Sequence, residues 1–88
     1  MSGVVIYTGH LCGYCSQAKK LLKSKNIDFE EINIHDQYDK KEEMIKLSGG
    51  RVSVPQIFSY GKHIGGCDDL FDMESAGELD KALNIEID

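Results

Sequence analysis

The sequence predicts an α/β fold in which a four-stranded mixed sheet carries helices on both faces. Residues 4–8 form an apolar, β-branched run that is typical of a strand buried inside a sheet. Apolar residues with helical spacing follow over residues 13–25. A second strand-like and helix-like pair covers residues 27–34 and 40–48. This order predicts parallel strands joined by a right-handed crossover.

The helix expected over residues 13–25 has a clear apolar face and a lysine-rich opposite face. Asn26 suits the left-handed conformation in which helices commonly end. Residues 36–39 include N-cap candidates for the helix expected over residues 40–48. The pair Gly49-Gly50 is expected to end that second helix. Both helices are therefore bounded by residues that favour helix ends.

The second half of the chain predicts a β-hairpin and two further helices. After Pro55, residues 56–59 form a short strand, residues 60–62 a tight turn, and residues 63–64 the antiparallel return strand. Asp68 or Asp69 can cap a third helix, and Ser75 can cap a short last helix. The expected sheet therefore has four strands, two from each half of the chain.

Composition limits the classes of protein to consider. With 88 residues, the chain is expected to form a single domain over residues 1–88. Its 15 acidic and 10 basic residues give a net charge of −5, which argues against nucleic acid as a partner. We find no signal peptide and no membrane span, and an odd number of cysteines, three, does not suit a secreted disulfide scaffold. We therefore expect a cytoplasmic protein with no membrane partner. We expect a monomer, because no apolar stripe is left over after the core is assigned.

The pair Cys12 and Cys15 is the main candidate for chemistry. Cys12 lies at the start of a predicted helix, where free backbone N–H groups and the helix dipole favour a thiolate. The thiolate is the nucleophile in disulfide exchange. Cys15 lies about one turn further along, on the apolar side of the helix. We therefore expect Cys12 to attack disulfides and Cys15 to act as the resolving thiol.

A zinc site is the first alternative for this pair. A structural zinc site needs four ligands, which commonly come as two closely spaced pairs. This chain offers one pair, and its other candidate ligands are scattered: His10, His35, His63 and Cys67. A structural zinc site is therefore not expected.

Four lysines follow the cysteine pair at positions 19, 20, 23 and 25. Such a basic patch beside two thiols can attract anionic ligands. The plainer interpretation is a solvated helix face, which is the usual role of a run of charges.

Several separated segments of the chain together resemble the glutaredoxins, which are small thioredoxin-fold proteins that use glutathione. The segments are Tyr7-Thr8, Cys12-Gly13-Tyr14-Cys15, Ser53-Val54-Pro55 and Gly65-Gly66-Cys67-Asp68-Asp69-Leu70. The resemblance covers nearly the whole chain and implies a thioredoxin fold. It also implies a glutathione-dependent oxidoreductase that reduces protein disulfides and glutathione mixed disulfides. Glutathione reductase and NADPH would act indirectly, by regenerating glutathione.

The resemblance also implies a set of residues that bind glutathione. They are Tyr14, Arg51, Ser53, Val54, Pro55, Gly66, Cys67 and Asp68. A cis bond before Pro55 would expose the backbone of Val54 to pair with the cysteinyl part of glutathione, as an added strand does. The helix start at Gly66 would receive the γ-glutamyl carboxylate, and Asp68 its ammonium group.

The remaining implied contacts lie at the two ends of glutathione's path. Tyr14 would pack near the glutathionylated sulfur of Cys12. Arg51 and Gln56 are candidates for the glycine carboxylate. Cys67 is expected to line the groove and not to act as a third catalytic thiol.

The chain departs from the family's usual pattern at two positions. Gly13 replaces the proline of the usual Cys-Pro-Tyr-Cys, and Gly9 stands where a lysine is usual. Glycine adds backbone freedom at the helix start. The lysine charge would help to hold a thiolate, and His10, when protonated, is a candidate substitute.

Two alternative functions remain open. Glutaredoxins that lack the proline can hold a [2Fe–2S] cluster between two protomers, through the first cysteine of each and two glutathione thiolates. Gly13 raises that option here, with Cys12 as the ligand. The other alternative is an electron donor that depends on thioredoxin reductase and not on glutathione. The segment Gly65-Gly66-Cys67-Asp68 argues against it, because it resembles the glutathione-binding signature.

Overall fold

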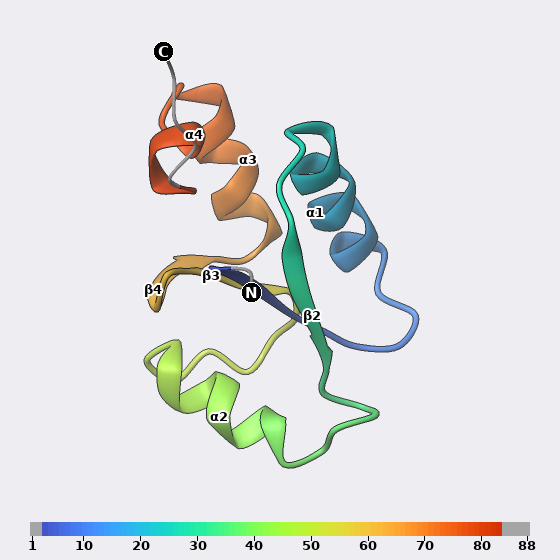
Figure 1. Ribbon diagram of the computed structural model, residues 1–88. Helices are drawn as coiled ribbons and strands as arrows, with labels where there is room; N and C mark the ends of the chain where they lie inside the picture. The colour runs from blue at the N-terminus through green and yellow to red at the C-terminus, as the bar shows by residue number, and fades with distance from the viewer. Residues whose placement is uncertain (1–2, 84–88) are drawn as a thin grey trace.

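The computed structural model describes residues 3–83 and contains one four-stranded mixed sheet (Figure 1). The strands are β1 (Val4–Thr8), β2 (Phe29–Asn33), β3 (Gln56–Ser59) and β4 (Lys62–Gly65), in the spatial order β2-β1-β3-β4. β1 pairs in parallel with β2 and antiparallel with β3, and β3 pairs antiparallel with β4. The predicted mixed sheet is therefore confirmed.

The helices lie on both faces of the sheet (Figure 1). They are α1 (Gly13–Ser24), α2 (Lys40–Leu47), α3 (Cys67–Ser75) and α4 (Leu79–Ala82). Figure 1 shows α1, α3 and α4 on one face and α2 on the other. Successive side chains of a strand point to opposite faces, so Ile6 and Tyr7 of β1 belong to two different cores.

The two cores anchor the elements that carry the cysteine pair. Under α1 and α3, Leu22 and Leu70 are fully buried against Ile6 and Ile57. On the other face, Met44 of α2 is fully buried in a cluster with Tyr7 and other residues of the sheet. Burying a side chain of this size contributes about 1.5–3 kcal/mol. The start of α1 therefore rests on a rigid base.

Most predicted boundaries are confirmed within one or two residues. Asn26 has the expected positive φ of 58° just after α1. The turn of the hairpin consists of Tyr60 and Gly61, both with positive φ, and Lys62 already belongs to β4. The second strand is shorter at both ends than expected, because only residues 29–33 pair with β1.

One predicted helix cap is wrong: Ser75 is the last residue of α3 and does not cap the last helix, whose N-cap is Glu78. The N-cap residue of α3 is Gly66, and Asp69, in the first turn, caps this helix with its side chain, as predicted. Within residues 3–83 no helix has the length and apolar content needed to cross a membrane.

Candidate active site

Cys12 and Cys15 form a disulfide at the start of α1, with their Cα atoms 5.2 Å apart. Cys12 is the N-cap residue of the helix, and its Sγ accepts the backbone N–H of Cys15 at 3.0 Å. Cys15 is only 2% exposed, whereas Cys12 is half-buried. The geometry therefore makes Cys12 the thiol that a substrate can reach and Cys15 the internal one.

The segment before β3 faces this pair. The bond between Val54 and Pro55 is cis, as the resemblance implied. The carbonyl oxygen of Val54 lies 3.9 Å from Cys12 Sγ. Backbone polar groups of Val54 thus lie next to the sulfur of the accessible cysteine.

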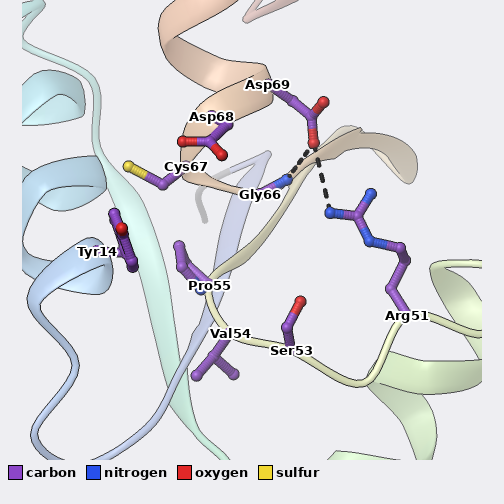
Figure 2. Close-up of a pocket in the computed structure, with 9 residues that line it drawn as sticks. All are labelled: Tyr14, Arg51, Ser53, Val54, Pro55, Gly66, Cys67, Asp68 and Asp69. Carbon is purple, nitrogen blue, oxygen red and sulfur yellow. Dashed lines mark hydrogen bonds and ion pairs between the residues drawn. The ribbon is translucent and has the colours of Figure 1, made fainter.

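A pocket of about 230 Å³ opens beside Val54 (Figure 2). It is lined by Tyr14, Arg51, Ser53, Val54, Pro55, Gly66, Cys67, Asp68 and Asp69. The structure therefore brings together around one cavity every glutathione-binding candidate except Gln56, although they come from three separate parts of the sequence. Asp69 is the one lining residue that the sequence analysis did not assign to the site.

Asp69 stabilises the start of α3 and connects it to Arg51. Its Oδ2 accepts the backbone N–H of Gly66 at 2.9 Å and lies 3.6 Å from Arg51 Nη2 (Figure 2). Asp69 is the third residue of the helix, where a carboxylate can reach back to the N-cap N–H, so its sequence position already carried this signal. Its ion pair with Arg51 could not be predicted from its position in the sequence.

Cys67 is the first residue of α3 and is 6% exposed. Burial, together with the negative charge of Asp68, raises the pKa of the Cys67 thiol. Its place in the lining of the pocket agrees with the prediction of a groove residue. Because a thiol with a raised pKa is a poor nucleophile, the environment of Cys67 does not favour catalysis.

Gln56 does not line the pocket, so its proposed contact with the glycine carboxylate is wrong. Its fully buried side chain donates from Nε2 to the backbone oxygen of Ser53 at 3.1 Å, and Oε1 lies 2.7 Å from His63 Nε2. Burial, and then the charge of Arg51, lowers the pKa of His63. Gln56 therefore holds Ser53 from beneath, and Arg51 is the only one of the two candidates at the pocket.

In the loop before Cys12, the neighbouring side chains leave little space for a side chain at Gly9. A Cβ at this position would lie 2.9 Å from Cε1 of His35 and 3.2 Å from Cγ2 of Val54. His10, the candidate substitute for the usual lysine, is exposed, and its Nε2 lies 2.8 Å from Oδ1 of Asp36. The structure thus directs the His10 side chain to a carboxylate.

Part of the lysine patch on α1 is neutralised by carboxylates. Lys19 pairs with Glu31 at 3.1 Å, and Lys25 pairs with Glu74 at 2.8 Å and Asp80 at 2.6 Å. The hydrogen bond that Lys25 donates to Asp80, followed by the one that it donates to Glu74, raises the pKa of Lys25. These pairs favour the plainer interpretation of a solvated, ion-paired helix face. Among residues 3–83 there is no group of three His, Cys, Asp or Glu side chains arranged to hold a metal ion.

Comparison with known proteins agrees with this geometry. A family model described as Glutaredoxin matches residues 4–64. Glutaredoxin 3 of Escherichia coli strain K12 is 52% identical over 83 residues, covering 94% of this chain and 99% of that protein. Glutaredoxin 1 of Rickettsia prowazekii is 51% identical over 81 residues, covering 91% of this chain and 85% of that protein.

Solved structures show the same fold. A buckwheat glutaredoxin–glutathione complex superposes with a TM-score of 0.83 at 30% identity, covering 93% of this chain and 76% of that one. Glutaredoxin from Brucella melitensis has a TM-score of 0.79 at 42% identity, covering 99% of this chain and 96% of that one. The thioredoxin fold implied by the sequence is therefore confirmed.

Proposed function

This chain belongs to the glutaredoxin family and is a thiol–disulfide oxidoreductase, and on that premise we propose that its reductant is glutathione. The proposed substrates are protein disulfides and glutathione mixed disulfides. The observation that carries the proposal is the pocket beside Cys12, which combines a helix start, a carboxylate and a guanidinium group. The likeness to a buckwheat glutaredoxin–glutathione complex supports it.

The pocket offers a partner for each polar group of glutathione. The N–H groups in the first turn of α3 suit the γ-glutamyl carboxylate, because a helix start favours anions. The side chain of Asp68 is exposed at the pocket and suits the ammonium group, whereas Asp69 is already engaged by Gly66. Arg51, whose Nη2 lies 3.6 Å from Oδ2 of Asp69, offers a guanidinium group for the glycine carboxylate.

The reaction follows from the different exposure of the two cysteines. The Cys12 thiolate attacks one sulfur of a substrate disulfide, and the bonding electron pair leaves with the other sulfur, which takes up a proton. The Cys15 thiolate then attacks Cys12 Sγ, which forms the disulfide seen here and releases the substrate as a thiol. One glutathione thiolate opens that disulfide and forms a mixed disulfide with Cys12. The thiolate of a second glutathione attacks the glutathione sulfur of this mixed disulfide, which releases glutathione disulfide and leaves Cys12 as a thiolate.

Coupled turnover tests this proposal. Reduction of a small glutathione mixed disulfide is followed as NADPH consumption in the presence of glutathione and glutathione reductase. Wild type is compared with Cys12→Ser and Cys15→Ser. The proposal predicts turnover in wild type and its loss in Cys12→Ser. Activity that survives without glutathione, with NADPH and thioredoxin reductase alone, contradicts it and supports the alternative donor.

The Cys15→Ser variant distinguishes two routes through the same site. Retained turnover shows that a glutathionylated Cys12 is sufficient and that Cys15 is auxiliary. Lost turnover shows that the intramolecular disulfide is obligatory. We further propose that the protein works as a cytoplasmic monomer; sedimentation of the apoprotein tests the oligomeric state, and a stable dimer contradicts it.

The second candidate is a carrier of a glutathione-ligated [2Fe–2S] cluster. Gly13, which stands in place of the usual proline, raises this option, and the start of α1 is open there, because a Cβ at Gly13 would meet no atom within 4 Å. Cys12 is the residue that would hold the cluster, whose other ligands would come from glutathione and a second copy of the chain. Anaerobic reconstitution that gives a brown dimer supports this role, and a colourless monomer contradicts it.

A further inference from the structure

The loop of residues 9–11, which leads from β1 to Cys12, is held by a side chain from another part of the chain. The backbone N–H of His10 donates to Nδ1 of His35 at 2.7 Å. His35 lies 25 residues further on, in the connection from β2 to α2. An imidazole nitrogen therefore takes the place of the carbonyl oxygen that usually accepts a loop N–H group.

The same imidazole packs against the loop. If Gly9 carried a Cβ, this atom would lie 2.9 Å from Cε1 of His35 and 3.2 Å from Cγ2 of Val54. Val54 in turn contacts Cys12 through its carbonyl oxygen. The His35 ring and the Val54 side chain thus occupy the space beside Gly9, and the carbonyl oxygen of Val54 lies 3.9 Å from the reacting sulfur.

The loop needs such an external support. Leu11, which directly precedes Cys12, has a φ of 52° and a fully exposed side chain. A left-handed conformation is unfavourable for leucine, and its exposed side chain gains no packing that would compensate. His35 is itself fixed, because its backbone N–H donates to Oδ1 of Asn33 at 2.9 Å.

We propose that His35, in its neutral form, is a positioning residue that holds the loop before Cys12 through its Nδ1. Nδ1 can accept the His10 N–H only while it carries no proton, so protonation of His35 replaces this hydrogen bond with two opposed N–H groups. The His10 imidazole lies beside the His35 ring, with the ring centroids 5.1 Å apart, and its Nε2 lies 2.8 Å from Oδ1 of Asp36. The proposal rests on Cys12 as the reacting thiol and not on glutathione.

The experiment measures the alkylation rate of Cys12 by iodoacetamide in the reduced Cys15→Ser protein, by mass spectrometry. This readout needs no glutathione, so it is independent of the function proposed above. His35→Asn keeps an acceptor oxygen at the place of Nδ1 but does not titrate, whereas His35→Leu removes the acceptor. His10→Ala keeps the backbone donor and removes only the His10 ring.

We expect His35→Leu to slow alkylation by about three- to tenfold near neutral pH, because the loss of one hydrogen bond loosens the loop. We expect His35→Asn and His10→Ala to stay within about twofold of the parent under the same conditions.

Either of two results overturns the proposal. One is a His35→Leu protein that is folded by circular dichroism and reacts at the parent rate across the pH range. The other is a His35→Asn protein that is as slow as His35→Leu at neutral pH, which would show that the acceptor at Nδ1 does not hold the loop. Slow alkylation of Cys12 in the His10→Ala protein would also contradict the proposal, because it would show that the His10 ring, and not the backbone hydrogen bond, holds the loop.

Discussion

The starts of α1 and α3 both carry a cysteine, and their environments are opposite. Cys12 caps α1, is half-buried, and accepts the N–H of Cys15; the first turn of α1 contains no acidic residue. Cys67 opens α3, is buried, and is followed directly by Asp68 and Asp69. A helix start alone therefore does not make a thiol reactive. Access and the charge of the first turn decide it.

The two helix starts also contribute different groups to the site. The start of α1 supplies the sulfur, and the start of α3, with its acidic first turn, borders the pocket in which we place glutathione. An acidic first turn stabilises α3 and provides the carboxylate of Asp68, at the cost of a less acidic thiol in Cys67. A helix start thus carries the reacting thiol in α1 and, in the proposed function, binds the ligand in α3.

The largest expected difference between the two starts is in thiol reactivity. In the folded, reduced protein, Cys12 should react with iodoacetamide at least about a hundredfold faster than Cys67 at neutral pH, because Cys12 is accessible whereas Cys67 is buried and its pKa is raised. Peptide mapping by mass spectrometry measures both rates in one sample. In guanidinium chloride the two rates should converge. Similar alkylation rates for Cys12 and Cys67 in the folded protein would show that the two helix starts do not differ in thiol reactivity.

The next effect concerns Asp68 as a binding group. Asp68→Asn should raise the KM for glutathione by about three- to tenfold, because one charge-assisted contact is lost, and leave kcat within about twofold. Asp72→Asn is a matched control, since Asp72 is exposed on the same helix and does not line the pocket. Coupled turnover at varied glutathione gives both constants. An equal rise in KM in both variants would point to net charge and not to a specific contact.

Asp69 is expected to act on stability more than on binding. Asp69→Ala should lower the free energy of unfolding by about 1 kcal/mol, because the N–H of Gly66 loses its capping acceptor. Asp72→Ala should change it by less than about 0.5 kcal/mol. Urea titration followed by circular dichroism measures both. If the two variants are equally stable, the cap contributes nothing.

The smallest effect is the dependence of stability on pH through Cys67, whose pKa is raised by burial and by Asp68. As pH rises above the ordinary thiol pKa, the unfolded chain loses this proton while the folded chain keeps it, so folding becomes less favourable. The stability difference between wild type and Cys67→Ala should change in that direction from about pH 8 to 10, by at most about 1.4 kcal/mol per pH unit. The oxidised protein is used, because its Cys12–Cys15 disulfide does not titrate. A constant difference contradicts the prediction.

The features that the sequence predicted well are local. The run of residues 4–8 and the helical spacing after Gly13 fix β1 and α1, because strand and helix periodicity are visible within a few residues. The place of Cys12 at a helix start follows from the same short stretch. The candidate pocket residues, in contrast, depended on resemblance to a family, since Pro55 and Gly66 meet Tyr14 only once the sheet is folded.

The errors arose where side chains have several possible partners. Gln56 was expected at the pocket, but it turns inward to Ser53 and His63, which a strand position alone does not reveal. Asp69 was considered only as a cap, because its approach to Arg51 depends on how α3 packs above the loop. The contact between His10 and His35 joins residues 25 apart, and no periodicity predicts it.

The most direct test of the proposed function is to locate glutathione on the protein. The Cys15→Ser variant is converted to its mixed disulfide with glutathione, and amide chemical shifts are compared with those of the reduced form by NMR. We expect shifts at Val54 and at Gly66, Cys67 and Asp68, along both sides of the pocket. Shifts confined to the first turn of α1, with the start of α3 unchanged, would contradict it.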